Sequence, residues 1–281
     1  MSGRDSLGLL QRQILPPIVE LSLGIRGIYN VEIGERPRAA VRRLYEETLG
    51  LAGLADVCPL GRFSLAVGPS ASPLSGVLTF AGAGGSIRAV TFAIGRGQMA
   101  NWRARLVHSG TRVVGRAWQF DEEHLCFVDD ADFDLALVEV AEDKAWYGTG
   151  ASDAILGFRG VEVAAGPTGE LESLFAAIDV VPARLEKPLA RFEFARDGGR
   201  FALDVLRSDD TPAQPDGTGQ PPQRLSFEVT DLAALDHLRR RLGAAGFVVA
   251  PIVGRSAGFH VRLRSLRDLE IGFLVNDRLA P

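Results

Sequence analysis

Apolar and polar residues alternate in four segments of the chain, with the two-residue period of a half-buried β-strand. β-Branched and aromatic residues occupy many of the apolar positions, which favours extended structure. Each segment precedes turn or cap residues and then a helical stretch. The four segments are GIYNVEI (27–33), IRAVTFAI (87–94), FRGVEVA (158–164) and RLSFEV (224–229).

The helix after the fourth segment has the clearest signals. Thr230 or Asp231 can cap the stretch LAALDHLRRRLGAAG, because a short polar side chain accepts hydrogen bonds from free backbone N–H groups. Gly243 and Gly246 predict its end. Leucines at spacings of three and four residues predict one buried face. These leucines are Leu232, Leu235, Leu238 and Leu242.

The other three segments fit the same order of strand, helix and further extended runs. A helix is expected between Pro37 and Gly50, with Val41, Leu44 and Tyr45 buried. Further helices are expected around 97–109 and near 168–177. Such a unit cannot bury both of its faces alone, so two units are expected to form a curved sheet with helices outside and a concave pocket inside.

We therefore predict an α+β fold of four βαβββ modules in two pseudo-symmetric half-barrel sheets, in the manner of repeat architectures. Polar stretches rich in Pro and Gly set the boundaries between the modules. The predicted order is an N-terminal extension (1–24), a first pair of modules (25–86 and 87–139), a linker (140–157), and a second pair (158–206 and 223–276) with a polar loop (207–222).

Composition is that of a folded globular protein, with 46 % hydrophobic and 23 % charged residues and a formal net charge of -4. This balance gives no basic surface for nucleic acid, and no apolar run reaches the roughly 20 residues of a membrane helix. Cys58 and Cys126 lie in apolar contexts, which predicts buried free thiols. With no secretory signal pattern at the start, the expected location is the cytoplasm.

Several of these segments together resemble one known family. The fourth unit contains a helix ending in LGAAG and a following APIV run, the second contains LCFVDDADFDLALVE, and the first contains SGVLTF. In this order they are similar to the modules of the vicinal-oxygen-chelate superfamily (glyoxalase, bleomycin resistance protein and ring-cleavage extradiol dioxygenase). The closest likeness is to its four-module hydroquinone-type ring-cleavage dioxygenases, over residues from about 25 to 276.

The resemblance implies a metal site whose ligands are missing here. Enzymes of this family hold Fe(II) or Mn(II) with two histidines and a carboxylate, which suit a first-row divalent metal. The matching positions are Asn30, Arg224 and Gly272. Equivalent positions of the second and third units are Ala89, Ala136 and Gly160. None of these residues is a usual ligand, so no metal cofactor is expected and no catalytic residue is assigned.

Arg224 is the main candidate at the vacant site. Its guanidinium either replaces the metal as the local cation and binds a carboxylate or phenolate, or forms an ion pair with Glu32 and binds no ligand. Glu228 and Glu270 are further inward carboxylates. The predicted pocket residues are Asn30, Glu32, Arg224, Arg255, His260 and Arg262. His108, His124 and His237 are interpreted as surface or cap residues.

Three functions remain open at this point. The leading hypothesis is a metal-independent binder of a small anionic or aromatic molecule. The alternatives are a ring-cleavage dioxygenase with a relocated metal site and a catalytically inactive partner subunit. The expected partner is a small-molecule ligand, with neither nucleic acid nor membrane, and homo-oligomerisation is left open.

Overall fold

The computed structural model of the protein describes most of the chain in ten stretches. These are residues 24–54, 63–68, 76–81, 85–140, 153–165, 168–196, 199–207, 222–252, 257–266 and 268–275. Most of the predicted extension (1–24), linker (140–157) and polar loop (207–222) therefore lies outside the described residues.

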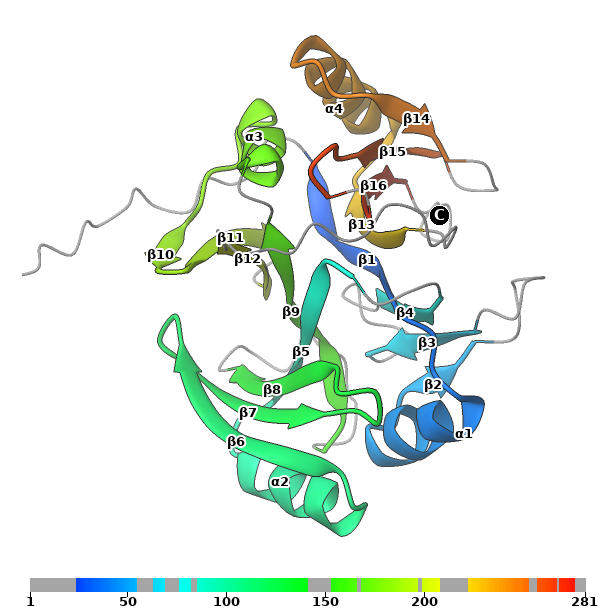
Figure 1. Ribbon diagram of the computed structural model, residues 1–281, viewed down its shortest axis with the longest axis vertical. Helices are drawn as coiled ribbons and strands as arrows, with labels where there is room; N and C mark the ends of the chain where they lie inside the picture. Colours follow the sequence, from blue (N-terminus) through cyan, green and yellow to red (C-terminus); the bar gives the residue numbers. More distant parts are fainter. Residues whose placement is uncertain are drawn as a thin grey trace, which may run out of the picture.

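One eight-stranded sheet, here called sheet A, combines the first and fourth modules (Figure 1). Its strand order is β14-β15-β16-β13-β1-β4-β3-β2. The first module supplies β1 (Ile25–Ile33), β2 (Ala52–Gly53), β3 (Phe63–Val67) and β4 (Gly76–Phe80). The fourth supplies β13 (Gln223–Val229), β14 (Val249–Pro251), β15 (Gly258–Arg262) and β16 (Leu269–Leu274).

The second and third modules form sheet B, in the order β10-β11-β12-β9-β5-β8-β7-β6. The second module supplies β5 (Ile87–Gly95), β6 (Arg112–Gln119), β7 (Glu122–Val128) and β8 (Asp134–Val140). The third supplies β9 (Ile155–Ala165), β10 (Arg184–Glu186), β11 (Leu189–Arg196) and β12 (Gly199–Arg207). Two curled sheets with helices outside confirm the predicted fold class.

Each sheet joins its two modules through their first strands. β1 pairs with β13 and β5 pairs with β9, both antiparallel. The first module thus shares a sheet with the fourth, and the second with the third. This joining of the first module to the fourth is the arrangement on which the predicted closeness of Arg224 to Glu32 depends. Each of the chain-order pairs, 25–139 and 158–276, thus contributes one module to each sheet. β9 also begins inside the predicted linker, at Ile155.

Helices cover the outer faces of both sheets (Figure 1). They are α1 (Arg38–Val41), the π-helical segment η1 (Arg42–Thr48), α2 (Met99–His108), α3 (Glu170–Ala177) and α4 (Leu232–Ala244). As predicted, Asp231 caps α4 by accepting a 2.8 Å hydrogen bond from the backbone N–H of Ala234. The described helices include none long and apolar enough to cross a membrane.

The first predicted helix is present, with Val41, Leu44 and Tyr45 buried, but the predicted burial of Leu232 in α4 is wrong. The first helix is α-helical for four residues and then π-helical for seven. Leu232 is 61 % exposed, whereas Leu235, Leu238 and Leu242 are buried as predicted. At about 100° per residue, Leu232 lies roughly 120° around the helix from Leu238, so it stands at the margin of the buried face.

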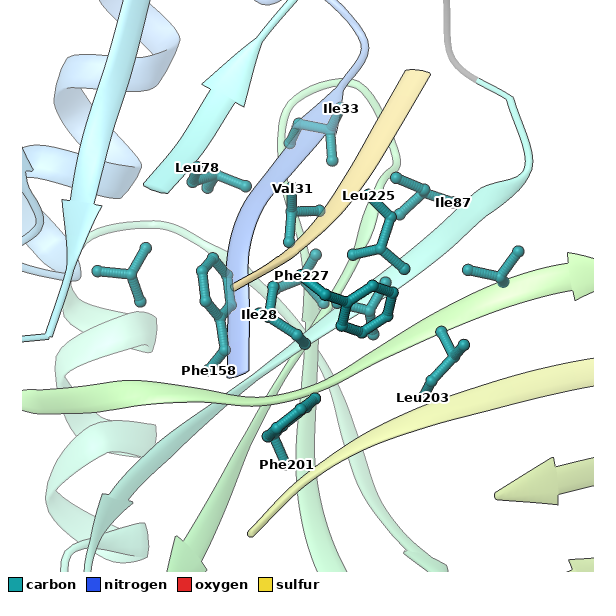
Figure 2. Packing of buried hydrophobic residues seen from close by; sticks show 14 of the residues in the cluster. Ile28, Val31, Ile33, Leu78, Ile87, Phe158, Phe201, Leu203, Leu225 and Phe227 are labelled. Carbon is teal, nitrogen blue, oxygen red and sulfur yellow. The ribbon is translucent and has the colours of Figure 1, made fainter. Parts of the chain in front are cut away.

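The core lies where the central strands of the two sheets meet. Figure 2 shows Ile28, Val31 and Phe227 of sheet A close to Phe158 and Phe201 of sheet B. These residues are buried, and the Phe201 and Phe227 rings lie 6.4 Å apart between centroids. Side chains alternate between the two faces of a strand, and these residues use one face for core packing. The residues next to them in the sequence therefore point to the concave faces.

Gly76 on β4 allows one close approach between the sheets. A Cβ atom at this position would lie 2.3 Å from Cε2 of Phe158, which is far inside van der Waals contact. The phenylalanine ring from β9 therefore rests directly on the glycine backbone of β4, and the two sheets are fixed relative to each other at this point.

Candidate ligand-binding site

Polar side chains cross the concave face of sheet A in two adjacent rows. Strand alternation puts them there, because their neighbours Leu225, Ile271 and Val261 are in the core. The charged row contains Arg262, Glu270 and Arg224 on β15, β16 and β13, with Glu32 on β1 beside it. The neighbouring row contains His260, Gly272, Ser226 and Asn30.

The charged row alternates in sign from strand to strand. Nη2 of Arg224 donates to Oε2 of Glu270 at 2.9 Å, and Nη2 of Arg262 donates to Oε1 of Glu270 at 2.6 Å. Nη1 of Arg224 lies 3.9 Å from Oε1 of Glu32, which is an ion pair but too long for a hydrogen bond. Two guanidinium groups therefore share the one carboxylate of Glu270.

Glu270 is the buried centre of this row, with a side chain only 3 % exposed. Burial alone would raise the pKa of Glu270, but hydrogen bonds from Arg224 and Arg262 and the nearby His260 outweigh it and leave the pKa below its usual value. The carboxylate is therefore ionised at neutral pH and holds both arginines in place.

His260, in the neighbouring row, also lies close to Glu270. Its Nε2 lies 3.7 Å from Oε1 of Glu270. Burial lowers the pKa of His260, the attraction of Glu270 opposes this, and the positive charges of Arg224 and Arg262 lower it further. The imidazole is therefore neutral at neutral pH. Among the described residues, Nδ1 of His260 and Nε of Arg224 find no hydrogen-bond partner.

The row beside the charges forms a low floor. Gly272 has no side chain, and a Cβ atom there would lie 2.7 Å from Oγ of Ser226. Asn30 is held at the far end, where its Oδ1 accepts a 2.9 Å hydrogen bond from Oγ1 of Thr79. Oγ1 of Thr79 in turn lies 2.9 Å from Oγ of Ser64. The floor thus extends from the amide of Asn30 to the neutral imidazole of His260. Arg224 and Arg262 lie beside it.

The predicted site residues are only partly brought together. Arg224, Arg262 and His260 lie around Glu270, and Glu32 adjoins Arg224. Asn30 instead contacts Thr79. The predicted ion pair between Arg224 and Glu32 exists, but Glu270 is the closer partner because parallel pairing sets it directly beside Arg224. Arg255 lies outside the described residues.

The possible metal ligands on this face do not converge. In the described part of the chain, no group of three or more His, Cys, Asp or Glu side chains is placed to hold a metal ion. Glu270 and His260 are near each other, but the arginines already occupy both carboxylate oxygens. A dication beside two guanidinium groups would also be repelled.

The concave face of sheet B carries a second charged cluster that sequence reasoning missed. Arg191 forms two 2.7 Å hydrogen bonds to the carboxylate of Asp204, and its Nη1 donates to Glu122 at 2.6 Å. Arg159 also donates to Glu122, through Nε at 3.0 Å. The side chains of both arginines are at most 9 % exposed. These hydrogen bonds between arginine and carboxylate join charged groups on both sides, which makes them stronger than neutral ones.

Two titratable groups on this face have large pKa shifts. His124 is only 4 % exposed, so its interpretation as a surface or cap residue is wrong. Burial lowers the pKa of His124 to about 4, against the attraction of Glu122 and with the repulsion of Arg191 and Arg159. Burial raises the pKa of Glu162 to about 7, and the charges of Asp204 and Asp134 add to this.

The turn between β6 and β7 closes over this second cluster. Phe120 and Asp121 have positive φ angles of 52° and 64°, which turn the chain tightly. The Phe120 ring lies 4.3 Å from the guanidinium carbon of Arg191, and its backbone N–H donates to Glu186 at 3.0 Å. The β6–β7 hairpin therefore reaches the opposite edge of the same sheet.

A signal for the second cluster was present in the sequence. Arg159, Glu162, Arg191 and Asp204 are charged residues inside otherwise apolar strands, and charged residues are rarely buried unless paired. Their signs balance within the second and third modules. The pattern therefore indicated a buried ion-pair network, although it could not indicate the partners.

Comparisons with known proteins show the same fold. No protein family model matches the chain, and no curated protein matches it. A Bacillus subtilis structure described as "putative dioxygenase" is similar with a TM-score of 0.71 and 20% identity, covering 90% of this chain and 86% of that one. Glyoxalase I from Zea mays is similar with a TM-score of 0.62 and 10% identity, covering 88% and 92%.

A third similar structure is the cppA protein of Streptococcus pneumoniae, with a TM-score of 0.50 and 14% identity over 90% of this chain and 99% of that one. At these identities the likeness concerns the fold. The protein has the vicinal-oxygen-chelate fold, as the resemblance in its sequence implied.

Proposed function

We propose that this protein binds a small anionic molecule without a metal, on the concave face of sheet A. The observation that carries the proposal is the sharing of one carboxylate, that of Glu270, between Arg224 and Arg262. An anionic group beside Arg224 would accept hydrogen bonds from guanidinium N–H groups that do not donate to Glu270. Arg224 is still 30 % exposed at the side chain, so a ligand can reach it.

The shape of the face supports a flat ligand. Gly272 and Ser226 form a floor without a large side chain next to Arg224. A phenolate or carboxylate oxygen would accept from the guanidinium, and an aromatic body would lie over the floor toward His260. The neutral imidazole of His260 offers a further hydrogen-bond donor or acceptor. A fixed, planar guanidinium suits such an oxyanion better than an ammonium group.

The alternative with a relocated metal site makes a different demand. It needs three ligands around one ion, and the described residues hold no such group. Metal analysis of the purified protein after expression with iron and manganese separates these functions. We expect less than a tenth of an equivalent of either metal, and near-unit occupancy would favour the dioxygenase alternative.

Titration with 4-nitrophenol tests the proposal directly, because its phenolate absorbs differently from the neutral phenol. Binding beside Arg224 should lower the apparent pKa of the probe. Arg224→Leu should abolish this shift, and Arg264→Leu should keep it, because Arg264 is an exposed arginine of the same module. A wild-type protein that leaves the probe's titration unchanged, or an equal shift in Arg224→Leu, would contradict the proposal.

A further inference from the structure

We infer that the protein has a second ligand site, which takes a short aliphatic monocarboxylate and uses Arg105 as its anion-binding residue. It lies in a crevice of about 360 Å³ between the first module, α2 and the start of β9. None of its lining residues belongs to the charged row or to the floor beside Arg224. The site is therefore independent of the function proposed for sheet A.

The crevice lies where the two sheets approach each other at one end. The end of η1 and the adjoining strand β2 form one wall, and the end of β3 and the start of β9 form another. Gly68 sits at this junction with φ of +90°, and a Cβ atom there would lie 2.8 Å from the carbonyl oxygen of Leu156. This close backbone contact joins the walls and fixes their separation.

Arg105 reaches this crevice in a prepared orientation. Its guanidinium carbon lies 4.8 Å from the Trp102 ring centroid, and Trp102 is a fully buried residue of the same helix. Stacking on a buried ring limits the rotamers of the arginine and keeps the guanidinium plane in place. Its Nη2 makes one long contact of 3.5 Å, with the backbone oxygen of Glu47.

The charge of Arg105 is not neutralised within the described part of the chain, where it makes no ion pair. This separates it from Arg159, Arg191 and Arg224, each of which has a carboxylate partner. A partly buried guanidinium with one weak hydrogen bond retains donors for an oxyanion. A carboxylate fits these donors because its two oxygens match the fork of the guanidinium.

The remaining walls select an apolar body for the ligand. Leu49, Leu51 and Ile155 are buried side chains along the crevice, and Ala66 and Ala154 leave room between them. A volume of this size is within the usual range of small-molecule sites. Aliphatic walls next to one guanidinium fit a carboxylate that carries a short alkyl chain.

Asp153 further limits the class of ligand that the crevice can bind. It also lines the crevice, and no ion pair joins it to Arg105 among the described residues. Its carboxylate would repel a second anionic group on the ligand. The site should therefore prefer a monocarboxylate such as hexanoate over the dicarboxylate adipate, although both present the same carboxylate to Arg105.

Calorimetric titration of the full-length protein with hexanoate tests the inference. We expect one hexanoate per chain in the crevice, with affinity there rising roughly fourfold for each methylene added from butyrate to hexanoate. Adipate and the uncharged hexanol should bind at least tenfold more weakly. Arg105→Gln should weaken hexanoate binding at least tenfold, and Arg105→Lys should weaken it less, because the charge stays while the fork is lost.

Two control variants make the outcome specific. Arg103→Gln changes an exposed arginine two residues away on the same helix and should leave hexanoate binding within twofold. The same titrations in an Arg224→Leu background remove the site proposed on sheet A, so hexanoate that still binds there and is lost with Arg105→Gln is bound in the crevice. Ala154→Trp should block binding by filling the crevice, which provides a second test if Arg105→Gln does not fold. Absence of hexanoate binding to the wild type, or equal binding to Arg105→Gln, would overturn the inference.

Discussion

Arg224 on β13 and Glu270 on β16 are direct neighbours in a parallel strand pair, joined by a hydrogen bond of 2.9 Å. Glu270 also accepts from Arg262, so removing its charge leaves two guanidinium groups without their acceptor. The pair is therefore a structural support for this face as well as a part of the proposed site.

Glu270→Gln should destabilise the protein by about 1–3 kcal/mol, because a buried charge-assisted network loses the carboxylate that joins its two arginines. Urea unfolding at pH 7 measures the effect. Since the pKa of Glu270 is lowered by folding, its contribution is present at neutral pH and is lost as the pH falls through the folded-state pKa. The difference between wild type and Glu270→Gln should therefore shrink in acid, and a constant difference down to pH 3 would contradict this assignment.

Glu162 should make the protein less stable at higher pH. Its folded-state pKa of about 7 lies above the ordinary value of 4.5, so stability contributed below pH 4.5 is lost as the pH rises through 7. Glu162→Gln should remove this loss and stabilise the protein by roughly 1–3 kcal/mol more at pH 8 than at pH 5. The exposed Glu47→Gln serves as control and should show no such pH dependence.

His124 should act in the opposite direction. Its folded-state pKa of about 4 lies below 6.5, so the unfolded chain binds a proton that the folded one does not between these values. Stability is then lost as the pH falls from 6.5 to 4, by on the order of 2 kcal/mol at pH 5. His124→Gln should flatten the acid limb of a thermal unfolding series, whereas His108→Gln on the exposed end of α2 should leave it in place.

Gly76→Ala should cost about 2–4 kcal/mol, because the added methyl group overlaps the Phe158 ring and forces the sheets apart. Gly27→Ala on β1 is the matched control, since a Cβ atom there meets nothing within 4 Å. Thermal unfolding of the two variants compares them. If both variants melt together, the close packing of β4 on Phe158 does not limit stability.

The strands and helices of this fold were largely predictable because their signals are local. The alternation in residues 224–229 predicted β13, and Asp231 predicted the start of α4. Local signals did not show which two modules share a sheet. The family resemblance, and no local pattern, put the first and fourth modules side by side, because the antiparallel pairing of β1 with β13 joins residues about 200 positions apart.

The candidate site was predictable only in part for a related reason. A resemblance placed Arg224 on the inner face, but its main partner depended on the register that sets Glu270 beside it. The crevice at Arg105 had no sequence signal at all. It arises where α2, the residues that follow η1 and the start of β9 come together. These segments are far apart in the sequence, so no local pattern indicates that they meet.

The pairing of the first module with the fourth has a consequence for synthesis on the ribosome. β1 is synthesised before its partner β13, with the second and third modules between them, so the inner edge of the first module stays open while those modules complete their own sheet. An unpaired edge of this kind is prone to wrong strand pairing, and contacts of such high sequence separation form slowly. The nascent chain therefore exposes this edge until β13 has emerged, and chaperones that bind extended apolar strands should engage it around residues 25–33 during that interval.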